Sequence, residues 1–182
     1  DIVEKYKDNL IVLTGNLYGE VPSKILNLGE RQAEEALLWW KDKFKDDLYI
    51  ELMRHNQDDE KRANEVLISL SKKHKVSLVA TNNTFYTNQE DANAHDILLC
   101  LKEGEKQSTP IGKGRGYRYG LPNQEYYFKS QEQMKELFDD LPDAILSCSS
   151  IISKVSSFDL SNQVLLPKFE IPNEFKLENK SD

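Results

Sequence analysis

The sequence is poor in the residues that build disulfide frameworks and metal sites. It contains two cysteines and three histidines in 182 residues, no CxxC pair, and no two histidines at metal-ligand spacing on one element. Cys100 and Cys148 each stand in an apolar helical pattern, which is typical of buried thiols. Two buried thiols without a disulfide framework favour a reducing compartment, so the sequence predicts a cytoplasmic protein.

Long apolar runs and a basic excess are also absent. No apolar run approaches 18 residues, so no transmembrane helix and no membrane partner is expected. Asp and Glu outnumber Lys and Arg by 31 to 24, which gives a net charge of −7. A protein that holds nucleic acid by itself normally carries a positive excess, because it must neutralise phosphates. The composition therefore argues against stand-alone binding of DNA or RNA.

The first hundred residues alternate between strand and helix patterns. Short apolar runs predict strands at 10–15, 48–53 and 77–81, and segments with helical periodicity follow at 29–47, 58–74 and 89–104. This order predicts an α/β fold whose parallel strands are joined by right-handed crossovers. Both an open sheet and a β/α barrel are built in this way, and the pattern alone does not choose between them.

The alternation ends after Gly104. Residues 105–124 are rich in Gly and basic residues and predict an exposed loop, and "EYYFKS" at 125–130 is a candidate short strand. Ser130 begins a helix with a Ser-x-x-Gln capping box, and Pro142 suits the first turn of another. We expect one domain over residues 1–158 and an extended linker over 159–182.

No convincing catalytic set emerges from residue chemistry alone. His55 follows a strand, where a ligand or catalytic role competes with a plain hydrogen-bonding role, and His95 stands in a helix where it can orient the loop before it. Lys113, Arg115 and Arg118 make the 105–124 loop a candidate contact with protein or nucleic-acid phosphate, although a solvated loop is the simpler interpretation.

Five blocks of the sequence carry a resemblance to a known family. They are "TGNLYGEVPS", "IELMRHN", "LVATNNTFYTNQEDANAHDILLCL", "YYFKSQEQMKELFDDLPDAI" and "LLPKFEIP". In this order they closely resemble the PHP (polymerase and histidinol phosphatase) domain of the bacterial DNA polymerase III alpha subunit, from about residue 8 to residue 172. The resemblance implies the second half of a PHP domain, with a partial distorted β/α barrel that leads toward the polymerase palm.

The resemblance also locates a degenerate metal site. Three metal-ligand positions of the family fall on Asn16, Asn83 and Phe85, and the others would precede residue 1. Zinc and manganese favour thiolate, imidazole or carboxylate ligands, whereas an amide is a poor substitute and a phenyl ring offers no lone pair. We therefore expect no metal, no cofactor and no catalytic residue in this chain, although the parent polymerase would use Mg²⁺.

Two functions compete under this resemblance. The first is an inactive PHP module that stabilises the polymerase and docks the proofreading exonuclease, and that reaches DNA only through the parent enzyme. The second is a metal-dependent phosphoesterase or 3′–5′ exonuclease, which intact PHP domains can be. The replaced ligand positions favour the first. An excised half-barrel would also leave strand edges unpaired, which predicts self-association or a tail that covers the gap.

Overall fold

Three parallel strands form the sheet at the centre of the molecule. The computed structural model describes residues 2–157 and 161. The strands are β1 (Val12–Leu13), β2 (Leu48–Leu52) and β3 (Ser77–Ala80), in the order β1-β2-β3. Val12 pairs with Leu48, and Tyr49 pairs with Ser77. The predicted parallel α/β fold is therefore confirmed, as a mixed helix and sheet arrangement consistent with part of a PHP-type fold.

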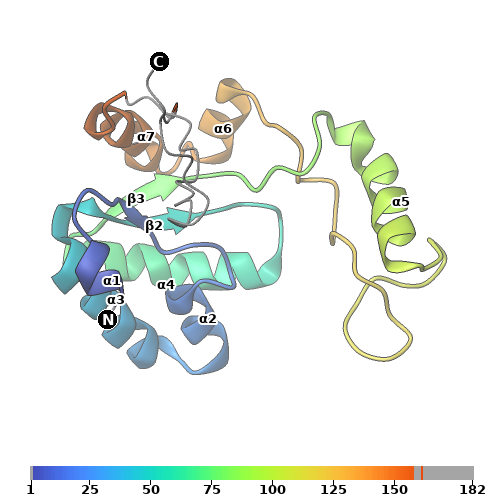
Figure 1. Ribbon diagram of the computed structural model, residues 1–182, viewed down its shortest axis with the longest axis horizontal. Helices are drawn as coiled ribbons and strands as arrows, with labels where there is room; N and C mark the ends of the chain where they lie inside the picture. Colours follow the sequence, from blue (N-terminus) through green and yellow to red (C-terminus); the bar gives the residue numbers. More distant parts are fainter. Residues whose placement is uncertain (1, 158–160, 162–182) are drawn as a thin grey trace, which may run out of the picture.

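Helices cover both faces of this sheet (Figure 1). On one face lie α2 (Glu20–Asn27), α3 (Glu30–Phe44) and α4 (Asp58–His74), with α1 (Ile2–Tyr6) beside them. On the other lie α6 (Gln131–Leu137) and α7 (Pro142–Lys154), and α7 packs along β3. α5 (Ala92–Glu103) stands apart from these layers. Two short 3-10 turns span Lys45–Asp47 and Gln89–Asp91.

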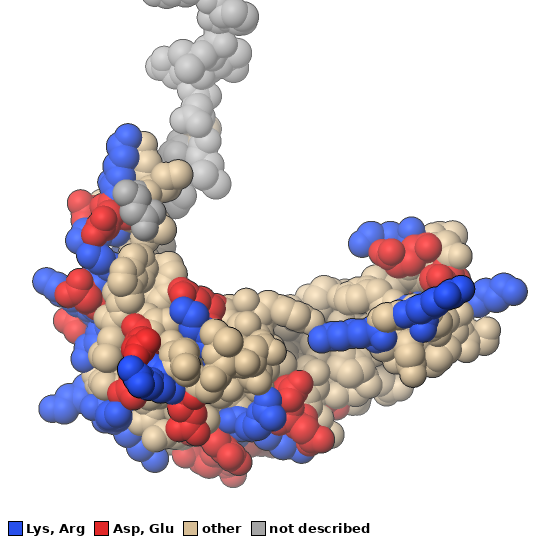
Figure 2. Space-filling model, turned by 90° about the horizontal axis from the view of Figure 1, so that it is seen from below, with Lys and Arg blue, Asp and Glu red and all other residues tan. Residues whose placement is uncertain are grey.

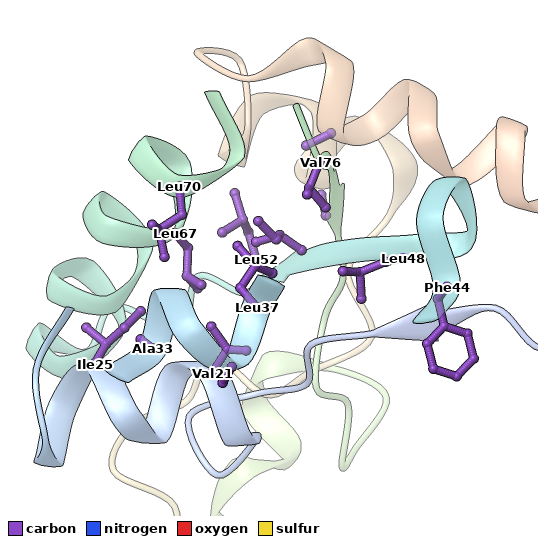
Figure 3. Packing of buried hydrophobic residues seen from close by; sticks show 14 of the residues in the cluster. Val21, Ile25, Ala33, Leu37, Phe44, Leu48, Leu52, Leu67, Leu70 and Val76 are labelled. Atoms are coloured by element: carbon purple, nitrogen blue, oxygen red, sulfur yellow. The ribbon is translucent and has the colours of Figure 1, made fainter. Parts of the chain in front are cut away.

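The core lies between the sheet and the α2–α4 layer (Figure 3). α3 forms because its apolar residues repeat every three to four positions, so that Ala33 and Leu37 both face inward and are 0% exposed. β2 is nearly continuous in apolar residues, as expected for a strand covered on both faces. From the opposite layer, Phe138 and Ala144 are also fully buried.

The helix ends follow the sequence signals. The Ser130 hydroxyl accepts a hydrogen bond from the Gln133 backbone N–H at 3.2 Å, which completes the predicted capping box. Gly104 ends α5 with φ +70°, a left-handed conformation that glycine adopts without steric cost. Cys100 is buried and Cys148 is half-buried, and both are free thiols.

Two strand predictions were wrong in extent. Only Val12 and Leu13 of the 10–15 run form β1, because the positive φ of Gly15 turns the chain and Leu10 is left exposed. The 125–130 segment contributes an isolated bridge between Tyr127 and Tyr86 rather than a strand. The 159–182 linker lies outside the described residues apart from Ser161, so the boundary at residue 158 stays a prediction.

Residues 88–124 project from the layered body, and we call this segment the arm (Figure 1). It consists of α5 and the 105–124 loop, and two connectors join it to β3 and α6. The connectors lie side by side, since the Phe85 N–H donates to the Tyr126 carbonyl at 2.8 Å and the Phe128 N–H donates to the Tyr86 carbonyl at 3.0 Å. Among the described residues, no helix has the length and apolar character needed to cross a membrane.

Candidate functional site

The turns that follow the three strands meet at one edge of the sheet, where an α/β protein usually places its chemistry. Asn16 follows β1, His55 follows β2, and Asn83 and Phe85 follow β3. The structure thus brings Asn83 and Phe85 together with His55, which sequence reasoning had not joined to them. Asn16 belongs to the neighbouring turn, and within the described part of the chain it forms no hydrogen bond with His55, Asn83 or Phe85.

Asn16 serves the turn between β1 and α2. Its side-chain oxygen accepts the Tyr18 backbone N–H at 3.0 Å, and its carbonyl accepts the Gly19 N–H at 2.8 Å. The turn is tight: a Cβ on Gly19 would lie 2.1 Å from the Thr14 carbonyl oxygen. The space beside Asn16 measures about 20 Å³, roughly the room of one water. This amide is therefore a turn-forming group.

A buried histidine–glutamate pair organises the turn after β2. His55 is 1% exposed and Glu60 is 6% exposed. Both carboxylate oxygens of Glu60 are used by His55, one by its backbone N–H at 2.6 Å and the other by its ring Nδ1 at 2.8 Å. Glu60 lies in the first turn of α4, where the helix dipole also favours a negative charge.

The same histidine holds the turn after β3. The Asn83 backbone N–H donates to His55 Nε2 at 3.2 Å. Because Nε2 accepts, the ring proton must reside on Nδ1, so His55 is a neutral imidazole that donates to the Glu60 carboxylate. Both ring nitrogens are therefore occupied within the protein, and neither is left to bind a metal.

Tyr126 covers the face of this imidazole. Its ring stacks on His55 with a centroid separation of 4.3 Å and an interplanar angle of 5°. The hydroxyl accepts a hydrogen bond from Gln57 Nε2 at 2.6 Å. Burial, together with the charge of Glu60, raises the pKa of Tyr126 to about 12. The phenol is therefore protonated at neutral pH and is neither a base nor a nucleophile there.

The remaining two predicted positions offer no strong ligand. Asn83 enters the network through its backbone, and its amide side chain forms no hydrogen bond within the described residues. Phe85 is 45% exposed, and its ring lies 5.6 Å from that of His95 and 5.9 Å from that of Tyr126. Across the described residues, no three His, Cys, Asp or Glu side chains gather as a metal site would require. The residues present do not fit the metal centre that the PHP family implies.

A groove of about 610 Å³ opens beside this network, between α4 and α6. Its floor includes Met53 and Leu137, and its rim carries Glu65 and Asp140. Arg54 spans the groove wall, because its guanidinium binds both oxygens of Asp140 at 2.6 and 2.9 Å. This pairing lowers the pKa of the Asp140 carboxyl. Arg54 and Asp140 are thus engaged with each other rather than available to a ligand in the groove.

The basic loop divides into two kinds of residue. Arg118 is 6% exposed and forms a two-point ion pair with Asp96 at 2.6 and 2.9 Å, so its guanidinium is committed within the arm. Lys113 and Arg115 are exposed. The role of the loop as a contact site stays a prediction. Among its described residues, Lys106, Lys113 and Arg115 are exposed cations that form no ion pair.

Comparison with known proteins finds similarity to one family. The PHP domain model matches residues 1–55. The DNA polymerase III subunit alpha of Borreliella burgdorferi is 38% identical over 176 residues, that of Campylobacter jejuni 36% over 185, and that of Aquifex aeolicus 33% over 186. These matches cover 96%, 96% and 98% of this chain, but the chain spans only about 15% of the length of these relatives. The chain is therefore a homologue of one segment of the bacterial DNA polymerase III alpha subunit, and it includes part of a PHP domain.

Proposed function

We propose that the chain is a catalytically inactive PHP module of a cytoplasmic DNA polymerase III alpha subunit, which stabilises the polymerase and docks its proofreading exonuclease. The parent enzyme would carry out DNA-directed DNA synthesis in replication with Mg²⁺, and DNA would be a partner through the parent enzyme. The alternative is a metal-dependent phosphoesterase or 3′–5′ exonuclease, which would need a complete ligand set.

One observation carries the inactive-module proposal: the sheet edge where PHP chemistry is expected is held by structural hydrogen bonds. His55 Nδ1 is hydrogen-bonded to Glu60, and His55 Nε2 accepts a hydrogen bond from the Asn83 N–H. Asn16 forms its own turn, and Phe85 has no lone pair. A hydrolase of this kind lowers the pKa of a metal-bound water from 15.7 to about 7, and these residues cannot hold the ion that does so.

The docking part of the proposal rests on exposed apolar surface. Three residues on one face of α5, Ile97, Leu98 and Leu101, are 49%, 61% and 79% exposed. Contiguous apolar residues of this kind mark contact surfaces in soluble proteins. Because the relatives are several times longer than this chain, the rest of the polymerase chain and the exonuclease subunit are the partners that we propose. A second copy of this chain is the competing occupant.

Metal analysis and a phosphoester assay test the inactivity. After dialysis against a weak chelator, we expect less than one equivalent of zinc or manganese per chain and no turnover of a phosphodiester with either metal added. Asn83→Ala is the matched variant, since it keeps the backbone N–H that His55 binds. Turnover that survives purification and falls in Asn83→Ala would contradict the proposal.

Size-exclusion chromatography tests the docking separately. We expect the chain to co-elute with the exonuclease subunit of the same organism. Light scattering on the chain alone measures the self-associated form. A chain that forms only its own dimer, and leaves the exonuclease in its own peak, would contradict the docking without bearing on the inactivity.

A further inference from the structure

The loop of the arm carries a local excess of positive charge, although the arm as a whole (88–124) has five acidic and five basic residues. Residues 106–124 contain four basic residues and no acidic one, whereas the whole chain has a net charge of −7. Figure 2 shows Lys and Arg side chains on the arm together with acidic ones, and a surface with few charges between the arm and the body. Within the described part of the chain, Lys113 and Arg115 form no ion pair and no hydrogen bond through their side chains. Their charges are therefore available to a ligand.

The buried ion pair of Arg118 gives the tip of the arm a defined shape. Besides binding Asp96, the guanidinium donates from Nε to the Thr109 carbonyl at 2.8 Å. The backbone is paired at the same point, since the Arg118 N–H donates to the Pro110 carbonyl at 3.0 Å and the Gly112 N–H donates to the Arg118 carbonyl at 3.1 Å. The glycine-rich loop is thus closed on itself and anchored to α5.

This anchoring turns two tyrosines outward. In extended backbone, residues i and i+2 point to the same side, so the inward Arg118 places its neighbours Tyr117 and Tyr119 on the outer side. They are 52% and 56% exposed. The Tyr117 ring packs over Gly112, where an added Cβ would lie 2.3 Å from the ring carbon Cδ1. The tip therefore presents aromatic rings beside unpaired cations.

We propose that the tip of the arm, residues 106–120, is a contact site for single-stranded nucleic acid. Aromatic rings stack on unpaired bases without regard to sequence, while neighbouring cations hold the phosphates. Gly114 and Gly116 leave the backbone of the tip open to close approach by a phosphate, since an added Cβ at either would meet no atom within 4 Å. The bases of a duplex are stacked on one another, and an acidic peptide has no bases. Neither ligand can therefore stack on the exposed tyrosines as a single strand can.

The acidic body does not prevent this contact. Charges separated by more than about 10 Å are largely screened at 0.1 M salt, and the arm projects away from the body (Figure 2). The loop itself contains one acidic residue, Glu105, whose carboxylate lies 3.4 Å from the Thr109 hydroxyl, and the nearby Asp96 is paired with Arg118. Because the tip offers few phosphate contacts, we expect the affinity typical of non-specific binding, with a dissociation constant of about 10⁻⁴ to 10⁻⁶ M. This inference does not depend on the exonuclease docking.

Fluorescence anisotropy with a labelled 12-nucleotide oligothymidylate tests the proposal on the intact chain. We expect binding that weakens with salt. Removing both cations in Lys113→Ala/Arg115→Ala should reduce the slope of log affinity against log salt by about 0.7 for each lost phosphate contact. Removing both rings in Tyr117→Ala/Tyr119→Ala should lower the affinity about 5-fold or more per stacked base and leave the slope unchanged.

Two control variants test whether the loss of binding is specific to the tip of the arm. Lys61→Ala/Arg62→Ala removes two exposed cations from α4, and Tyr18→Ala removes a tyrosine that is 84% exposed, so neither should change binding. Circular dichroism checks that each variant is folded. Absence of binding, equal losses in the control variants, or preference for a polyglutamate peptide with no effect of the tyrosines would each overturn the proposal.

Discussion

Replacing Glu60 by Gln should destabilise the chain strongly, although the change exchanges only one oxygen for an NH₂ group. The two carboxylate oxygens accept one hydrogen bond each from His55. Glutamine keeps one acceptor but turns an NH₂ group toward the other donor, so one charge-assisted bond is lost and a buried N–H is left unpaired. These two costs predict a loss of about 2–4 kcal/mol in the free energy of unfolding. Domains of this kind are stable by only about 5–15 kcal/mol in total.

Urea denaturation followed by circular dichroism measures this loss. Glu65→Gln is the control, because Glu65 is an exposed glutamate on the same helix and should change stability by less than about 0.5 kcal/mol. The melting temperature of Glu60→Gln should fall by about 2–4 °C for each kcal/mol lost. If Glu60→Gln and Glu65→Gln unfold at the same urea concentration, the His55–Glu60 pair does not hold the sheet edge as argued.

Two further outcomes are expected. Leu37→Ala should lower the free energy of unfolding by about 2–5 kcal/mol, since Leu37 is 0% exposed. Leu38 is 42% exposed, so Leu38→Ala should lower it by less than about 0.5 kcal/mol. Equal urea midpoints for the two variants would contradict the assignment of the core. The Arg118 ion pair lowers the pKa of Asp96 below its ordinary value of 3.8, so the stability that it adds is complete above that pH and is lost as the pH falls through the lowered folded value. The difference in melting temperature between the native chain and Asp96→Asn should therefore shrink below pH 3.8, and a difference that persists there would refute this linkage.

The elements with long, regular patterns could be predicted from the sequence. α3 and α4 repeat their apolar residues over four turns, and the Ser130 box and Gly104 mark helix ends by local chemistry. α2 went unpredicted because it is only eight residues long and contains Pro22. β1 was predicted too long because an apolar run does not reveal how many of its residues meet a partner strand.

For the candidate site, the sequence allowed us to predict the kinds of side chain present but not the contacts between them. The resemblance located Asn16, Asn83 and Phe85 as poor ligands, and that judgement needs only the nature of their side chains. The network around His55 depends on contacts with Asn83, 28 residues later, and with Tyr126 on the return from the arm. Periodicity carries no information on such distant pairs. Likewise, the sequence shows Arg118 as one of four basic residues in the loop and gives no sign of its partner Asp96.

The paired connectors have a consequence for how this chain can vary. The hydrogen bonds that join Phe85 to Tyr126 and Phe128 to Tyr86 place the exit and the return of the chain at one point. A segment that leaves and re-enters at one point can be lengthened, trimmed or exchanged with little strain on the rest, because the cost of closing a loop grows only slowly with its length. The arm is thus an interchangeable part: homologues can differ freely in its tip while β3 and α6 keep their places.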